Sequence, residues 1–472
     1  MTPSINNSSK KNHLLTGVCT TVLVSAFACA VFAASDSSND GIGGSFIPSV
    51  QTEFFTLADT YQTTDSGVSS GKHIQIQSDD SGEESGGNVS KQNAELNARL
   101  QLETGHIYDA TKSLNALLAQ NPNDAQLLGF TANAENYGGN WPYATYLLNQ
   151  AHAIAPENQD ITELLKEVRR EHAQDVEADF DWIKYGHSLE DVSALSGMVN
   201  AGPHWQIGAD VKDNEVQGRG VRLSDGYNGD KDQSKQQGEL YTQYSWQNGQ
   251  IVKASLFGNN EKAGGGLYYN FLNPLGETQL VGEYQRPYWD MPEAVLDDAV
   301  RDRIAFLHVI KPTTHLTIEG GAGWNQYNVD GTDDAIGSIT ADFNVLYRII
   351  DQVKYHSPYV DLGYNTDAEF TRTAKFSIDS DGDNTRILPL NSRDIQTPFV
   401  ELGEDLTPST YGDIAAGYQW DLLGGSGPMV EGKITHELTN MFDVQLRASY
   451  GLDTTQSENN ITTVGGYLRC RF

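Results

Sequence analysis

The sequence predicts an α+β, multi-domain protein in which a short helical solenoid precedes a transmembrane antiparallel β-barrel. Three observations lead to this fold class. A helical segment within residues 91–190 repeats its own pattern of small, apolar and proline residues at a constant spacing. From residue 203 to residue 472, apolar and polar residues alternate at the two-residue spacing of strands. The last of these strands ends on the aromatic residue Phe472, as in outer-membrane barrels. We expect about sixteen strands, enough for a water-filled channel.

Residues 1–33 have the features of a secretory signal peptide. Lys10 and Lys11 precede an apolar run over residues 14–32, and Ala33 offers a cleavage point. Residues 34–90 are rich in Ser, Gly, Asp and Asn, so they predict a disordered linker. No later apolar run reaches the roughly 20 residues of a membrane helix, so a membrane span must be a barrel.

The chain is strongly acidic, with 63 Asp and Glu side chains against 31 Lys and Arg and a net charge of −32. This balance makes nucleic acid an unexpected partner. It has two interpretations that the sequence leaves open, which are solubility alone or a path for a cationic substance.

The helical segment within residues 91–190 resembles the tetratricopeptide repeat, whose period is about 34 residues. Its repeated pairs are Gly105 and Gly139, Ala110 and Ala144, Leu114 and Leu148, and Pro122 and Pro156. The pattern predicts two helical pairs and a trailing helix over about residues 160–185. So short a solenoid needs a partner surface, which is either another periplasmic protein or the mouth of the barrel.

Strand alternation is clearest at residues 338–350, where Ile339, Phe343 and Tyr347 share one face and Thr340 and Asp342 share the other. Counting back from Phe472 predicts short periplasmic turns at residues 439–440 and near 365–366. It predicts outer loops at 454–460 and 379–393. The connection over residues 285–301 is counted on the periplasmic side and is expected to fold toward the pore.

Enzymatic, metal-binding and cofactor signatures are absent from the sequence. There is no nucleophile elbow, no His pair at metal spacing and no phosphate loop. The run 379–384 begins like a calcium loop, but Asn384 stands where glycine is needed, and Leu390 replaces the closing carboxylate. We therefore expect no catalytic site, no metal and no cofactor.

The candidate site is the pore wall. If apolar faces contact lipid, the opposite faces line the lumen and carry Asp342, Asp361 and Glu401. Residues 357–363 and 397–403 echo each other, and each sets an aromatic residue, Tyr359 or Phe399, beside a carboxylate. Aromatic faces with flanking acids suit sugar rings, although two strands can also begin alike without function.

The segment 286–302 adds further carboxylates, and Pro287 and Pro292 prevent it from being a plain strand. Arg286 and Arg301 are expected to balance part of its charge. Its candidate pore residues are Asp290, Glu293, Asp297, Asp298 and Asp302.

Helical repeats of this kind ahead of a large barrel resemble the outer-membrane exopolysaccharide export porins. The stretch Arg-Pro-Tyr-Trp-Asp at 286–290 and the Asp-Asp-Ala-Val-Arg-Asp at 297–302 most resemble the Pel-type porin, ahead of the poly-N-acetylglucosamine and cellulose types. The resemblance implies an electronegative pore for a cationic polymer, and periplasmic repeats that hold modifying enzymes. Members of that family carry many repeats, whereas this chain shows two.

From these observations we expect an outer-membrane porin, embedded in lipid, that conducts a secreted and cationic exopolysaccharide, with its N-terminal region in the periplasm. The alternatives are a surface receptor or adhesin anchored by the barrel, and a nonspecific diffusion porin. Residues 91–190 are the expected contact for a periplasmic protein.

Overall fold

The computed structural model describes residues 87–103, 106–202, 204–246, 249–313, 315–350, 358–378, 382–452 and 460–472. The expected signal peptide and nearly all of the expected linker lie outside these residues. Within the described ranges, no helix is both long and apolar enough to cross a membrane.

Five helices form the first domain: α3 (Gly87–Glu103), α4 (Ile107–Gln120), α5 (Ala125–Tyr137), α6 (Trp141–Ile154) and α7 (Gln159–Glu171). The repeat is visible in their lengths, because α4 and α6 each have 14 residues, and α5 and α7 each have 13 residues. The trailing helix ends at Glu171, so the expected helix to residue 185 is too long.

Caps and packing explain why these helices form. The side chain of Asp124 accepts a hydrogen bond from the Leu127 amide, and Asn158, at the equivalent position of the next repeat, accepts from the Asp160 and Ile161 amides. The paired positions Leu114 and Leu148 are both buried in one apolar core. The repeat therefore encodes equivalent caps and equivalent core positions in successive helical pairs.

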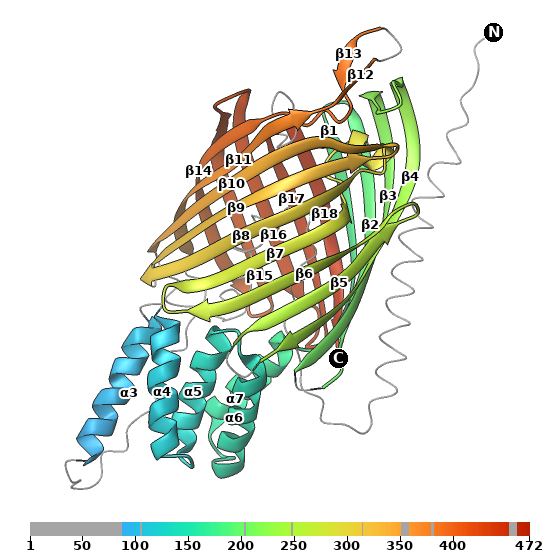
Figure 1. Cartoon of the computed structure of the whole chain (residues 1–472). Helices are drawn as coiled ribbons and strands as arrows, with labels where there is room; N and C mark the ends of the chain where they lie inside the picture. The colour runs from blue at the N-terminus through green and yellow to red at the C-terminus, as the bar shows by residue number, and fades with distance from the viewer. Residues whose placement is uncertain are drawn as a thin grey trace.

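Sixteen strands close into one antiparallel barrel (Figure 1). They are β1 (Asp175–Tyr185), β2 (Ser188–Asn200), β3 (Trp205–Arg222), β4 (Asn228–Ser245), β5 (Ile251–Asn259), β6 (Ala263–Asn273), β7 (Gly276–Pro287), β8 (Val300–Thr313), β9 (Leu316–Val329), β10 (Thr332–Ile350), β11 (Tyr359–Ala374), β14 (Arg393–Thr407), β15 (Thr410–Asp421), β16 (Ser426–Glu437), β17 (Phe442–Leu452) and β18 (Asn460–Arg471). The first strand β1 pairs with the last strand β18 and closes the barrel.

The barrel begins earlier than expected. β1 and β2 occupy residues that we assigned to the helical domain, and the expected start at residue 203 is therefore wrong. The strand count of about sixteen is confirmed, although two of the sixteen strands, β1 and β2, precede the expected start.

The outward face of the strands is apolar, as the alternation predicts. Ile304, Leu256 and Leu446 are each more than 60% exposed on that face, and Trp205, Tyr244 and Trp246 form an aromatic cluster at the helical end. Such an apolar belt with aromatic residues at its edge is what a membrane-spanning barrel presents to lipid.

Strand connections alternate between the two ends of the barrel (Figure 1). The turn at Thr439 and Asn440 lies at the helical end, as expected. Residues 365–366 lie inside β11, so the turn expected there is wrong. The connection between β11 and β14 lies at the opposite, outer end as expected, and carries the small hairpin of β12 (Phe376–Ile378) and β13 (Asn384–Arg386). The expected loop at 454–460 falls almost wholly outside the described residues.

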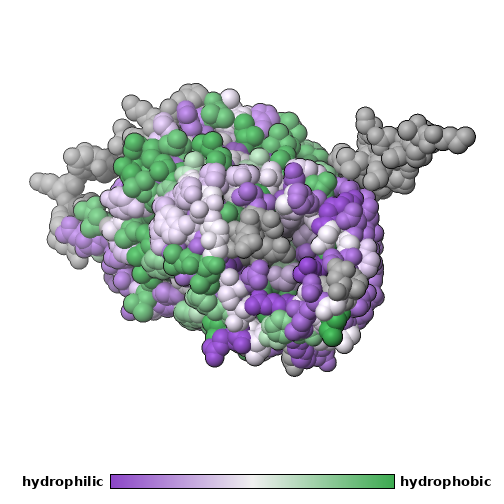
Figure 2. Space-filling view, turned by 90° about the horizontal axis from the view of Figure 1, so that it is seen from above, coloured by the Kyte–Doolittle hydropathy of each residue, from purple (hydrophilic) through white to green (hydrophobic). Residues whose placement is uncertain are grey.

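The connection between β7 and β8 is a correction. It also lies at the outer end, where Figure 2 looks onto the barrel, and not on the helical side. The strand order fixes this placement. The chain leaves α7 at the helical end, so each odd-numbered strand up to β7 runs from the helical end to the outer end. Its expected folding toward the pore is correct, since the connection contains the short helix α8 (Pro292–Leu296), whose described side chains are almost all buried.

Candidate functional site: the barrel lumen

The inner face of the wall is polar and charged along its length. On β3, Ile207 and Val211 face outward and are exposed, whereas Gln206 and Asn214 face inward and are buried. This parity places the predicted lumen residues Asp342, Asp361 and Glu401 inside the barrel, opposite the apolar belt. The interior of the barrel is therefore polar, and its outer surface is apolar.

A segment that we call the plug, residues 288–299, occupies the outer part of the lumen. On one side, Trp289, Val295 and Leu296 pack with Val216, Val221 and Leu223 at the outer end of β3. On the other side, Tyr288, Met291 and Ala294 pack with Tyr327 of β9, Ile336 of β10 and Leu388 and Leu390 ahead of β14. Since β3 and β10 lie on nearly opposite sides of a sixteen-strand barrel, the plug bridges the lumen.

Polar contacts fix the plug at its C-terminal end. Asp297 Oδ2 accepts a hydrogen bond of 2.7 Å from the Ser224 amide, and Asp298 forms an ion pair with Lys235 of β4. Asp298 adopts a φ of 48°, which is unusual for a non-glycine residue and is held by this contact and its neighbours. These two predicted pore carboxylates therefore hold the plug to the wall.

The other three predicted carboxylates of this segment differ in their settings. Asp302 Oδ1 accepts a 2.6 Å hydrogen bond from the Gln285 amide at the base of the plug. Asp290 and Glu293 are half-buried. Arg286 bridges Glu239 and Glu283 on the wall, at 3.2 and 3.1 Å.

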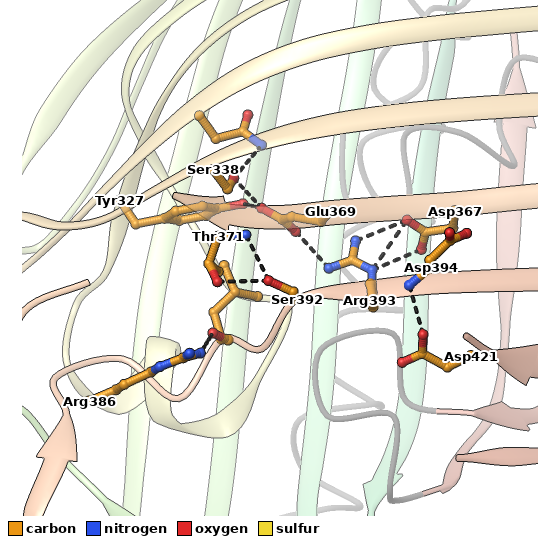
Figure 3. A network of polar contacts seen from close by, with 12 residues as sticks. Tyr327, Ser338, Asp367, Glu369, Thr371, Arg386, Ser392, Arg393, Asp394 and Asp421 are labelled. Atoms are coloured by element: carbon orange, nitrogen blue, oxygen red, sulfur yellow. Dashed lines mark hydrogen bonds and ion pairs between the residues drawn. The ribbon is translucent and has the colours of Figure 1, made fainter. Parts of the chain in front are cut away.

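A network of polar contacts surrounds Arg393, beside the apolar contacts of the plug (Figure 3). Arg393, at the start of β14, donates to Glu369 at 2.6 Å and pairs with Asp367 at 3.1 Å. Glu369 also accepts hydrogen bonds from the hydroxyls of Tyr327 and Ser338, at 2.8 and 2.5 Å. The network ties β9, β10, β11 and β14 together directly beside the apolar contacts of the plug.

The two echoing stretches are direct neighbours in the barrel. β11 and β14 pair so that Tyr359 lies opposite Gly403, Asp361 opposite Glu401 and Gly363 opposite Phe399. Each ring covers the glycine of the other strand, because a Cβ at Gly363 would lie 2.0 Å from Phe399 and one at Gly403 would lie 2.3 Å from Tyr359. The echo is therefore a reciprocal packing arrangement across one strand pair.

This packing changes what the aromatic residues can do. Tyr359 is only 5% exposed, its hydroxyl donates to Glu401 at 2.6 Å, and Arg348 lies over its ring at 4.6 Å. Arg348 also donates two 3.0 Å hydrogen bonds to Asp361. Phe399 remains half-buried. Phe399 has the more accessible ring for stacking, and Tyr359, Asp361 and Glu401 stabilise the wall.

Ion pairs connect the strands that close the barrel, and the acids that β1 contributes to them were not predicted from the sequence. Arg447 of β17 pairs with Asp179 and Asp181 of β1 at 2.8 and 2.6 Å, reaching across β18. The intervening Gly465 makes the contact possible, because a Cβ there would lie 1.9 Å from Asp181 Oδ1. Arg469 of β18 likewise pairs with Glu177 at 2.7 Å.

The acids of β1 could have been found from their spacing. Glu177, Asp179 and Asp181 alternate with apolar residues from residue 176 to residue 182, which is the pattern of a lumen strand. The preceding charged helix hid this change of period. Among the described residues, no three His, Cys, Asp or Glu side chains are arranged to hold a metal ion.

No protein-family model and no curated protein matches the sequence. Solved structures are similar in fold. A bacterial polysaccharide outer membrane secretin aligns with a TM-score of 0.46 and 11% identity, over 64% of this chain and 98% of that one. OprB of Pseudomonas putida at low pH aligns with a TM-score of 0.34 and 11% identity, over 67% and 97%. OprD of Pseudomonas aeruginosa aligns with a TM-score of 0.33 and 9% identity, over 64% and 93%.

Proposed function

We propose that this protein is an outer-membrane porin that conducts a secreted exopolysaccharide, and that the polymer is cationic. The observation that carries the proposal is the lumen itself. A barrel of sixteen strands encloses a wall of buried acidic, basic and amide side chains, and a bound segment narrows its outer end. A passage with many weak polar contacts suits a hydroxyl-rich chain that must slide.

The placement of the helices supports entry of the polymer from the periplasmic end. They lie against the end with short turns, which in this class of barrel is the periplasmic end. Arg170 of α7 forms an ion pair with Glu437 of β16, and a Cβ at Gly138 would lie 3.4 Å from Leu272 of β6. The helical domain thus packs against this rim of the barrel, and on the proposed orientation it would meet the polymer or a periplasmic protein there.

A surface receptor or adhesin would use outer connections that project, as the β3–β4 and β12–β13 hairpins do (Figure 1). The plug, however, folds inward, and Ile387, Leu388 and Leu390 pack against it. A nonspecific diffusion porin would need an open lumen, whereas the plug of this barrel contacts both walls. The plug therefore favours restricted passage over nonspecific diffusion, and the receptor or adhesin stays the alternative function.

Single-channel recordings of the full-length protein in planar bilayers test this proposal. Oligomers of glucosamine and of N-acetylglucosamine are added in turn on the side of the helical domain. We expect open-channel current that the glucosamine oligomers interrupt more often, because they are cationic. A barrel that never conducts, or that is blocked equally by both, would contradict the proposal.

A further inference from the structure

Within the described part of the chain, five oxygen atoms on the inner faces of β9 and β10 have no hydrogen-bonding partner. They are Glu319 Oε1, Asn325 Oδ1, Thr340 Oγ1, Asp342 Oδ2 and Asn344 Oδ1. Four of these residues are at least nine-tenths buried, with exposures of 4% for Glu319, 1% for Asn325, 6% for Thr340 and 9% for Asp342. Buried acceptors are normally paired, since leaving one unpaired costs about 1–3 kcal/mol.

These oxygen atoms form a continuous column. Strand pairing places Glu319 opposite Asn344, Gly321 opposite Asp342, Gly323 opposite Thr340 and Asn325 opposite Ser338. All of these residues share the inward parity, so the column follows the strand direction for roughly 20 Å. Two glycines on β9 leave one side of the column without side chains. It is therefore a strip of acceptors beside a shallow part of the wall.

The column has more hydrogen-bond acceptors than the neighbouring side chains have donors for them. Asp342 faces Asp367 of β11, and both Arg393 and Arg303 act on it electrostatically. Arg393, however, is hydrogen-bonded to Asp367 and Glu369 and not to Asp342. Arg303 of β8 lies opposite Asn325 at the outer end of the column. Glu319, at the periplasmic end, is hydrogen-bonded by the Asn344 side chain. The middle and the periplasmic end thus carry two carboxylates to which no arginine of the described residues is bonded.

A group rich in hydrogen-bond donors complements such a surface. A primary ammonium has three N–H donors and no acceptor, and it carries the charge that Glu319 and Asp342 would bind. A divalent metal ion is a poorer match, because no three metal-ligating side chains converge among the residues that the structure describes. Sugar hydroxyls could donate to Asn325, Thr340 and Asn344 on either side of the ammonium.

We infer that the inner face of β9 and β10 is a binding track for primary ammonium groups carried on a polysaccharide. The inference rests on the proposed function and names the wall that the cationic polymer contacts. The track also leads to the plug. Tyr327 and Ile336, two residues beyond Asn325 and Ser338, are part of the apolar cluster around the plug. A polymer entering from the periplasm follows the acceptors and then meets this constriction.

Isothermal titration of the full-length protein in detergent micelles tests the track without requiring an open channel. The probes are the glucosamine tetramer and the N-acetylglucosamine tetramer at pH 6. The variant is Glu319→Gln with Asp342→Asn, and the matched control is Glu215→Gln, an exposed carboxylate on the outer face of β3. Unchanged heat-dependent migration on gels confirms that each variant is folded.

We expect the wild type and the control to bind the glucosamine tetramer, and the double variant to bind about tenfold to a hundredfold more weakly, since charge-assisted hydrogen bonds are lost. Equal binding by all three proteins would overturn the track. Competition by potassium chloride without any binding of the tetramer would identify a site for inorganic cations only and would also overturn it. A protein that binds the tetramer through these residues but never conducts would support the track and refute the proposed conduit.

Discussion

On the wall formed by β17, β18 and β1, the carboxylates are paired with arginines, whereas on the described faces of β9 and β10 they are not. Asp179 and Asp181 share Arg447, Glu177 binds Arg469, and Asp443 binds Arg471 at 2.7 Å. Glu319 and Asp342 lie on the same kind of inward face, and within the described ranges Arg303 and Arg393 act on Asp342 electrostatically without a hydrogen bond to it. Parity alone places an acid in the lumen, and its partners decide between stabilising the wall and binding a ligand.

Removing the plug should have the largest effect. Replacing residues 288–299 by a Gly-Ser linker removes the segment that bridges β3 and β10 while leaving both walls of charges in place. We expect single-channel conductance to rise severalfold, because the outer lumen widens, with binding of the glucosamine tetramer retained. Unchanged conductance would show that the constriction lies elsewhere.

Breaking the charge pairs of the closing strands should destabilise the barrel. Arg447→Ala leaves Asp179 and Asp181 facing each other in the lumen, and we expect a loss of about 2 kcal/mol in unfolding free energy, reduced by the partial exposure of Arg447. Urea unfolding in detergent micelles, followed by gel migration, measures it.

Removing the two acids as well should rescue the Arg447→Ala variant. Adding Asp179→Asn and Asp181→Asn to Arg447→Ala should restore most of the lost stability, because no unpaired charge remains. Asp342→Asn alone should cost little, since no arginine loses a partner. If Asp342→Asn proved as destabilising as Arg447→Ala, the two walls would not differ as we describe.

A third environment, in the helical domain, predicts a pH dependence. Burial raises the pKa of Glu171 to about 7 and lowers the pKa of His172 to about 3. The contribution of Glu171 to the free energy of unfolding is present below its ordinary pKa near 4.5 and is lost as the pH rises toward 7. The contribution of His172 to the free energy of unfolding is present above about pH 6.5 and is lost as the pH falls toward 3. The two slopes oppose each other between pH 4.5 and 6.5.

Single substitutions separate these slopes. Relative to wild type, Glu171→Gln should make helix stability rise with pH in this window, and His172→Gln should make it fall, each by up to about 1.4 kcal/mol per pH unit. Circular dichroism at 222 nm during urea unfolding of the full-length protein measures both. Parallel pH profiles for the two variants would refute the assignment.

The smallest effect is expected at the contact between domains. The ion pair of Arg170 with Glu437 is more than a third exposed, so Arg170→Ala should lower helix stability by only about 0.5 kcal/mol or less. Lys112→Ala, on the exposed face of α4, is a control of similar chemistry. A loss of several kcal/mol would mean that the helices depend on the barrel far more than this contact implies.

Much of the barrel is predictable from the sequence, because lipid and lumen impose opposite polarities on alternate residues. β10 shows this well, with Phe343 and Tyr347 outside and Thr340 and Asp342 inside. β3 and β4 were harder to recognise, since their outer halves expose Asp213, Glu215 and Asp232 and so lose the apolar alternation. A strand that rises beyond the apolar belt no longer carries the pattern of a membrane strand.

The partners of the luminal charges could not be predicted. Arg447 and Asp181 are 266 residues apart, and their contact depends on closure of the barrel and on a glycine between them. The repeated aromatic and acidic pattern at Tyr359 and Phe399 could be recognised in the sequence. Its role in packing became clear only from the pairing of the two strands. Periodicity gives the face of a residue, whereas long-range register gives its neighbour.

The reversal potential of the full-length channel under a potassium chloride gradient measures whether the wall of the lumen selects cations. We predict a conducting channel that favours K⁺ over Cl⁻, because carboxylates without arginine partners among the described residues line β9 and β10. We also predict that Glu319→Gln with Asp342→Asn reduces this preference while Glu215→Gln does not. An anion-selective channel, or a preference unchanged in the double variant, would contradict the account.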